Sequence, residues 1–152
     1  MMIIRECTIS ELEQEPNIHT ILDEYAAESS IKGLPTPKAL VQTYKNLEAS
    51  GALHVIGAYI NSTLIGYITV LSPVMPHYSA VVSVTESYFV MAEYRSTGAG
   101  LKLLRAAEQY AESIGSAGLL VSAPTGGRLA EVLPRVGYNL TNQVFFKGFA
   151  DE

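Results

Sequence analysis

A run of β-forming residues passes within a few positions into a glycine-rich loop and then into an amphipathic helix, and this junction constrains the fold most. Residues 80–91 are rich in Val, Thr, Tyr and Phe, which favours a long strand. Residues 98–114 repeat apolar side chains at helical spacing. The connecting loop reads Arg95-Ser96-Thr97-Gly98-Ala99-Gly100. A strand, a loop and a helix in this order predict a sheet with helices packed on it.

The loop at residues 95–100 has the chemistry of an anion-binding site. Backbone N–H groups at the start of a helix are free to donate, and the helix dipole favours negative charge there. Glycines at positions 98 and 100 leave no side chain between a ligand and the backbone, while Arg95 offers a cationic or a loop-fixing contact. On this feature alone, a phosphate site and a plain tight turn are equally good interpretations.

The remaining pattern predicts a mixed α/β domain. Strands are expected at 2–7, 54–60, 64–71, 80–91, 118–122 and 144–149, with 54–60 and 64–71 forming a hairpin. Helices are expected from about residue 10 to about 28, from Pro37 to about 50, at 98–114 and at 126–136, where Gly137 ends the last one. Together they predict one domain over residues 1–152, built as a central twisted mixed sheet flanked by about four helices.

Composition narrows the possible functions. The 152 residues are 48% hydrophobic, enough for one domain with a real core, and a net charge of −5 argues against a nucleic-acid partner. No segment approaches a membrane-spanning length, so no membrane partner is expected. The lone Cys7 fits a reducing compartment, and we expect the cytoplasm. The three histidines show no metal-binding spacing, so no metal is expected.

The longer stretch Phe89-Val90-Met91-Ala92-Glu93-Tyr94-Arg95-Ser96-Thr97-Gly98-Ala99-Gly100-Leu101 resembles the acetyl-CoA motif of GNAT acyltransferases. That motif follows a strand and reads Arg or Gln, two residues, Gly, one residue, Gly or Ala. The order of the predicted elements is also similar to that family over essentially the whole chain. The Gly-Lys-Ser/Thr of a P-loop is absent. The resemblance implies an acetyl-CoA-dependent N-acetyltransferase.

The resemblance also implies a binding role for particular residues. The backbone of the strand end would bond the pantetheine arm, the glycine loop would hold the pyrophosphate, and residues 118–122 would splay from residues 80–91 to admit the thioester. The cofactor-binding set implied in this way is Val90, Met91, Ala92, Arg95, Ser96, Thr97, Gly98, Ala99, Gly100 and Ser122.

Three residues of the central strand are the catalytic candidates. The resemblance implies that the Val90 N–H stabilises the oxyanion. Glu86 lies four residues earlier, on Val90's side by strand parity, and is our candidate general base; a structural cross-strand residue is an equally good interpretation. Tyr88 shares that face and offers a hydroxyl, although packing is the commoner role of a strand tyrosine. Glu93 fits a solvated loop charge better.

The last predicted helix departs from the family pattern. Leu133 stands where relatives have the tyrosine that acts as general acid, and Gly127 stands where they often have asparagine. Thiolate protonation is then left to water or to a hydroxyl such as that of Tyr138 or Ser122. This departure supports an alternative function, a catalytically degenerate acyl-CoA-binding sensor or interaction module. A small α/β domain without CoA chemistry is a third possibility.

The acyl acceptor implied by the resemblance is an amine, on a small molecule, a peptide N-terminus or a lysine. Glu24 and Glu28 share one helix face and offer a wall for an amine, although a solvated face explains them as well. Family relatives often pair through sheet edges or last strands, so a homodimer is a further expectation. Phe145 and Phe146 suit that role, and suit a core equally.

Overall fold

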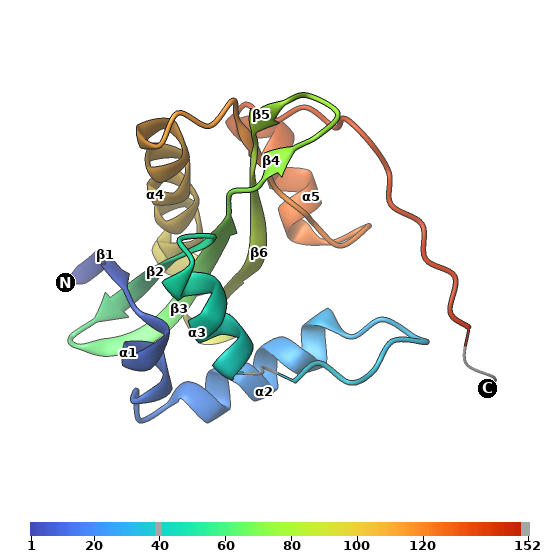
Figure 1. Cartoon of the computed structure of the whole chain (residues 1–152). Helices are drawn as coiled ribbons and strands as arrows, with labels where there is room; N and C mark the ends of the chain where they lie inside the picture. The colour runs from blue at the N-terminus through green and yellow to red at the C-terminus, as the bar shows by residue number, and fades with distance from the viewer. Residues whose placement is uncertain (39–40, 150–152) are drawn as a thin grey trace.

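The computed structural model describes residues 1–38 and 41–149, and its body is built on a five-stranded mixed sheet (Figure 1). The strand order is β1-β2-β3-β6-β7, with antiparallel pairs except for the parallel pair of β6 and β7. The strands are β1 Met2–Cys7, β2 Leu53–Ile60, β3 Thr63–Leu71, β6 Ser83–Val90 and β7 Leu119–Leu120. A separate two-stranded ribbon pairs β4 Val74–Met75 with β5 Ala80–Val81. The expected mixed α/β architecture is confirmed.

Helices cover both faces of the sheet. One face packs against α1 Ile9–Glu13, α2 Ile18–Ser29 and α3 Val41–Ala49, and the other against α4 Ala99–Ser113. The chain then forms α5 Arg128–Val132, and two 3₁₀ helices follow β6 and α5, η1 Ala92–Thr97 and η2 Leu133–Val136. The sheet therefore carries two hydrophobic cores, one on each face.

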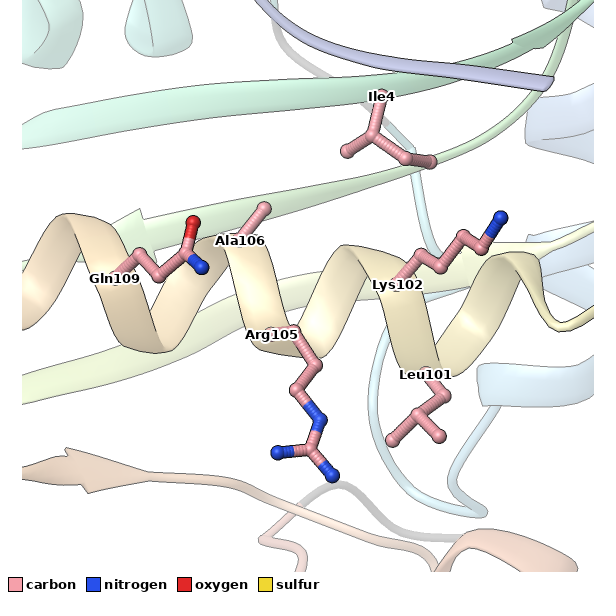
Figure 2. Close-up of a pocket in the computed structure, with 6 residues that line it drawn as sticks. All are labelled: Ile4, Leu101, Lys102, Arg105, Ala106 and Gln109. Carbon is pink, nitrogen blue, oxygen red and sulfur yellow. The ribbon is translucent and has the colours of Figure 1, made fainter.

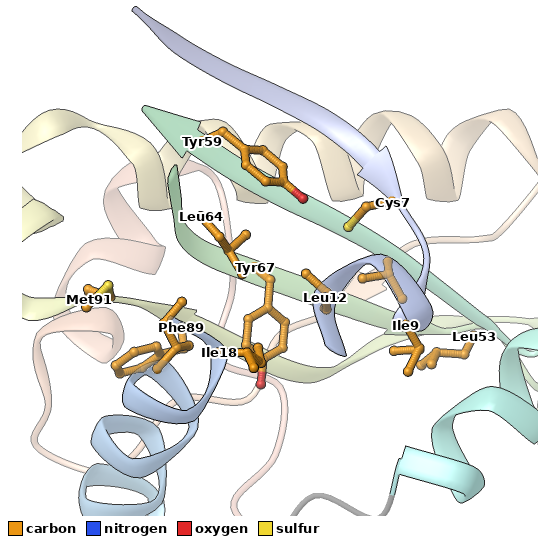
Figure 3. Packing of buried hydrophobic residues seen from close by; sticks show 12 residues of the cluster. Cys7, Ile9, Leu12, Ile18, Leu53, Tyr59, Leu64, Tyr67, Phe89 and Met91 are labelled. Carbon is orange, nitrogen blue, oxygen red and sulfur yellow. The ribbon is translucent and has the colours of Figure 1, made fainter. Parts of the chain in front are cut away.

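The core under α1, α2 and α3 joins side chains from all three helices to the sheet. Figure 3 shows Leu12 and Ile18 of the helices lying over Tyr67 and Phe89 of the strands. Residues packed in this way on the opposite face include Ile68, Val70, Leu103 and Ala107, all fully or almost fully buried. Because helices press on both sides, β3 reads as a nearly continuous apolar run rather than an alternating one.

Where the sequence predicted one first helix, the structure has two, α1 and α2. Thr8 caps α1, since its Oγ1 accepts a hydrogen bond from the Glu11 N–H at 3.0 Å. Pro16 then interrupts the helix that was expected to run to about residue 28, because proline lacks the N–H that a helix interior needs. The next helix begins at Val41 rather than at Pro37, and residues 39–40 of that expected helix lie outside the described residues.

Four expectations for the second half of the chain are wrong. The strand expected at 80–91 is divided at Val82, and the buried strand expected at 118–122 is reduced to β7, whose Leu120 is 41% exposed. Residues 144–149 form no strand, because no sheet edge lies beside them to complete a ladder. The helix expected at 126–136 is shortened and turns 3₁₀ at Pro134 before ending at Gly137.

Candidate functional site

The loop between β6 and α4 leaves the start of the helix open. Gly98 takes a left-handed conformation, φ 85°, and as N-cap of α4 it provides no side-chain cap. A Cβ placed on Gly98 would meet nothing within 4 Å. The Ala99 N–H donates to Thr97 Oγ1 at 3.3 Å, while Ser96 and Thr97 are exposed and Ala99 is buried. Open space at a helix start whose N-cap residue has no side chain fits a phosphate group.

Arg95 fixes this loop to its surroundings. Its Nε donates to the Val90 carbonyl at 2.8 Å, and its Nη2 lies 2.7 and 2.9 Å from the two carboxylate oxygens of Glu28. The guanidinium also lies over the Phe89 ring. Of the two roles expected for Arg95, the structure therefore supports loop fixing. Glu28, one of the two acidic candidates on α2, is the partner in this contact.

We expect the conservative change Arg95→Lys to weaken CoA binding about tenfold, because lysine cannot keep the fork that joins β6 to α2. Isothermal titration calorimetry with CoA measures the effect. Arg5→Lys is the matched control, since Arg5 also donates to a carboxylate, that of Glu11, but on α1. Equal CoA affinities of wild type and Arg95→Lys would contradict the role of the fork.

The edge of β6 opens beside this loop. β6 and β7 pair at Ser83 with Leu119 and at Val84 with Leu120, and in the described chain no further pair continues this ladder. The Ser122 N–H reaches the Thr85 hydroxyl at 3.3 Å. The Met91 N–H donates to β3, at the Ile65 carbonyl. Because successive strand amides point in opposite directions, the Val90 N–H faces the edge that opens.

Glu86 lies on the opposite face of β6 from Tyr88 and Val90, which corrects the expected parity. Thr69 pairs with Ser87 and the next residue, Val70, pairs with Thr85, so Glu86 is the extra residue of a β-bulge. The bulge turns Glu86 toward α3, where Tyr44 donates to it. Tyr88 instead packs with the α4 core. Uninterrupted alternation does not predict this arrangement, because a bulge shifts the phase of the strand by one residue.

Three hydroxyl groups hold the Glu86 carboxylate. Thr69 and Ser87 donate to Oε2 at 2.9 and 2.6 Å, and Tyr44 donates to Oε1 at 2.7 Å. Burial raises the pKa of Tyr44 to about 12, so this hydroxyl keeps its proton at neutral pH. Each carboxylate oxygen accepts about two hydrogen bonds. One acceptor position therefore remains on Oε1, on an exposed residue.

Tyr88 supports the start of α4. Its hydroxyl donates to the Gly100 carbonyl, and its backbone N–H donates to the Tyr25 hydroxyl at 3.1 Å. Burial raises the pKa of Tyr88 to about 12, so the phenol is neutral. The structure thus brings Tyr88 to the glycine loop and not to Glu86.

The candidates for thiol protonation make contacts with residues other than Glu86. The Tyr138 hydroxyl donates to Glu108 of α4 at 2.6 Å, and burial, followed by this bond, raises its pKa. Leu133, in the position of the family's usual tyrosine, is buried. Ser122 is exposed beside Thr85.

Sequence reasoning missed the groups that surround Glu86. Tyr44 and Tyr25 read as members of apolar helix stripes, and Thr69 and Ser87 read as ordinary strand residues. The sequence feature that marks these residues is a hydroxyl group within an otherwise apolar pattern. It indicates a site only when the neighbouring strand is known. Pairing across 42 positions, from Tyr44 to Glu86, is not visible in local spacing.

Other parts of the described chain are weaker candidates for the functional site. An open groove of about 360 Å³ lies between β1 and α4, away from the β6 edge; in Figure 2, Lys102, Ala106 and Gln109 extend toward Ile4, whereas Arg105 points to the other side. Among the described residues, no group of three or more His, Cys, Asp or Glu is placed to hold a metal ion. Nor does any described helix have the length and apolar character needed to cross a membrane.

An open loop at the start of α4 is the feature expected of a CoA-binding acyltransferase, and comparison with known proteins names the family. The acetyltransferase (GNAT) family profile matches residues 17–126. The chain therefore belongs to the GNAT family of acetyltransferases, enzymes whose acetyl donor is acetyl-CoA. A comparison with curated proteins finds no match.

Solved structures of acetyltransferases share the fold. A ribosomal-protein-alanine N-acetyltransferase from Brucella melitensis biovar Abortus 2308 is 15% identical, with a TM-score of 0.74 over 98% of this chain and 99% of that chain. A predicted acetyltransferase from Clostridium acetobutylicum, solved with acetyl-CoA, is 15% identical, with a TM-score of 0.77 over 97% and 96%. AAC(6')-Iy, in complex with the bisubstrate analog CoA-S-monomethyl-acetylneamine, is 17% identical, with a TM-score of 0.76 over 99% of both chains.

Proposed function

We propose that this chain is an N-acetyltransferase that moves an acetyl group from acetyl-CoA to a primary amine by direct attack in a ternary complex. The observation that carries the proposal is the start of α4, with open space above its N-cap residue Gly98, at the end of a strand that pairs with β7 only at Ser83 and Val84. Such a site offers backbone donors for a diphosphate next to a strand edge that an extended ligand can join.

In this proposal, different residues have different roles in binding and in the reaction. Residues 95–100 would hold the pyrophosphate, with Arg95 and Tyr88 fixing the loop from either side. The Val90 N–H would donate to the carbonyl oxygen as charge develops on it. Acetyl-CoA, when bound, supplies the thioester. Glu86 would receive the amine proton at the remaining acceptor position of Oε1, directly or through water.

Tyr44 connects the proposed base to the proposed acceptor side. It lies on α3, and Tyr25 and Tyr67 of the same hydrophobic core contribute further aromatic surface near Glu86. A carboxylate beside tyrosines favours a cationic, partly apolar acceptor. The neighbours named above include a ribosomal-protein-alanine N-acetyltransferase and a protein in complex with the bisubstrate analog CoA-S-monomethyl-acetylneamine. We propose an amine on a protein or on a small molecule as the acceptor of this chain. The free Cys7 supports our proposal of a cytoplasmic location.

The assay that tests this function measures free-thiol release from acetyl-CoA with a panel of polyamines, aminoglycosides and peptides. We expect release that depends on one class of amine. CoA binding by calorimetry without thiol release for any amine would favour the second function, a degenerate acyl-CoA-binding sensor. The observation that favours this alternative is the pair Leu133, buried in the usual acid's position, and Tyr138, whose proton is directed at Glu108. Absence of CoA binding would exclude both.

A further inference from the structure

A hydroxyl group from α2 lies at the outer edge of β6. The Tyr88 N–H donates to the Tyr25 hydroxyl oxygen at 3.1 Å. Since the Met91 N–H donates to β3 and successive strand amides point in opposite directions, the amides of Tyr88 and Val90 both face away from β3. That is the side on which β7 pairs only with the start of β6. The Tyr25 hydroxyl and the Val90 N–H therefore share one open edge.

Contacts along α2 hold Tyr25 in this position. Its ring stacks on Phe89, with centroids 5.0 Å apart and an interplanar angle of 16°, and meets the ring of Tyr67 edge-on at 6.2 Å. Tyr67 and Phe89 lie opposite each other on β3 and β6 (Figure 3). Three residues further along the same helix face, Glu28 holds Arg95 of the glycine loop. The end of α2 is thus attached both to β6 and to the loop that follows it.

The Tyr25 hydroxyl has a proton to donate. A phenol has one O–H donor as well as acceptor capacity, and here the oxygen accepts from a backbone N–H. Within residues 1–38 and 41–149, no hydrogen bond takes up its proton. Tyr138, a candidate for thiol protonation, directs its proton at Glu108 instead. Tyr25 is half-buried and combines a free O–H with a place at the β6 edge.

We propose that Tyr25 is the catalytic acid that protonates the leaving sulfur, an inference that rests on the proposed function. When the C–S bond breaks, its electron pair passes to sulfur, and the sulfur takes the proton of the Tyr25 hydroxyl. The amine has given its own proton to Glu86. The Tyr88 N–H stabilises the charge on the phenolate oxygen, which regains a proton from water.

The spacing along β6 suits this step. The nitrogens of Tyr88 and Val90 are two residues apart, about 7 Å along a strand. A carbonyl oxygen held by the Val90 N–H leaves room for the sulfur on the side of Tyr25. The assignment also accounts for Leu133 in the last helices, because the hydroxyl missing there is supplied from α2.

Turnover of Tyr25→Phe tests the chemical role. Phenylalanine keeps the stacking on Phe89 but has no proton to give. We expect kcat to fall about 30-fold, less than for loss of the base because water can also protonate a thiolate, with KM for the amine unchanged. Tyr59→Phe is the matched control: Tyr59 belongs to the same core, and its buried hydroxyl has no hydrogen-bond partner among the described residues. Wild-type kcat in Tyr25→Phe, or an equal loss in both variants, would overturn the assignment.

A binding experiment tests the contact with sulfur without any turnover. Calorimetry compares CoA with desulfo-CoA, which has hydrogen in place of the thiol, in the wild type, Tyr25→Phe and Tyr59→Phe. We expect the preference for CoA to be about threefold larger in the wild type and in Tyr59→Phe than in Tyr25→Phe, the effect of one weak hydrogen bond. Equal preferences in all three proteins would overturn this inference alone. Failure of the wild type to bind either compound would overturn the proposed function and this inference with it.

Discussion

Gly98→Leu is expected to weaken CoA binding by roughly 100-fold or more, because the new side chain fills the open space above the first turn of α4. Two hydrogen bonds from the backbone to a phosphate are worth about 1.5–3 kcal/mol each. Blocking their approach accounts for that loss. Calorimetry with CoA, at a temperature where the variant is folded, measures the affinity.

The matched control for this variant lies at the other end of the same helix. Gly115 also has a positive φ, 78° against 85°, and a Cβ there likewise meets nothing within 4 Å. Gly115→Leu therefore introduces the same backbone strain, about 1–2 kcal/mol, away from the loop. It should lower stability equally and leave CoA affinity unchanged. Equal loss of CoA affinity in both variants would show that strain, and not the loop, is responsible.

Glu86→Gln is expected to lower kcat by about 10²–10⁴-fold, the usual contribution of a positioned general base, with little effect on CoA affinity. The amide keeps the size of the side chain and its contacts with Tyr44, Thr69 and Ser87, because hydroxyl groups can either donate or accept. What it loses is the ability to take a proton. Initial rates of thiol release at saturating acetyl-CoA, with the amine identified by the panel, measure the effect.

Glu93→Gln is the control for loss of charge near the site. Glu93 is exposed in η1, which follows β6. It has the same negative charge as Glu86 but not the hydroxyl partners of Glu86. We expect its turnover to match that of the wild type. Wild-type turnover in Glu86→Gln would remove Glu86 from the mechanism, and a general loss of rate in both variants would point to electrostatic attraction of the amine instead.

Local patterns predicted the elements on which the site depends. The helix at 98–114 and the hairpin of β2 and β3 are confirmed, because their apolar periodicity and their turn signals are strong over many residues. The turn at Asn61 and Ser62, with φ 49° and 67°, is the tight left-handed turn that joins twisted strands. The glycine loop lies at a helix start as expected.

The features that the sequence did not predict depend on contacts between distant segments. The bulge at Glu86 arises from how β6 meets β3, and the Arg95 fork depends on where α2 packs. Neither is encoded in the residues next to it. The segment at 144–149 has the composition of a strand but no edge beside it, so its strand propensity alone does not produce a strand.

The bulge makes β6 two half-strands that are out of phase with each other. Before the bulge, side chains alternate between the two faces of the sheet in step with Ser83. After it, they alternate in step with Ser87. Removing Val84 or Thr85 would restore an even count and rotate Glu86 away from α3, while every amino acid of the proposed site stayed in the sequence. For the base that we propose, the spacing within this strand therefore matters as much as the identity of its residues, and we expect an insertion or deletion there to be more damaging than most substitutions.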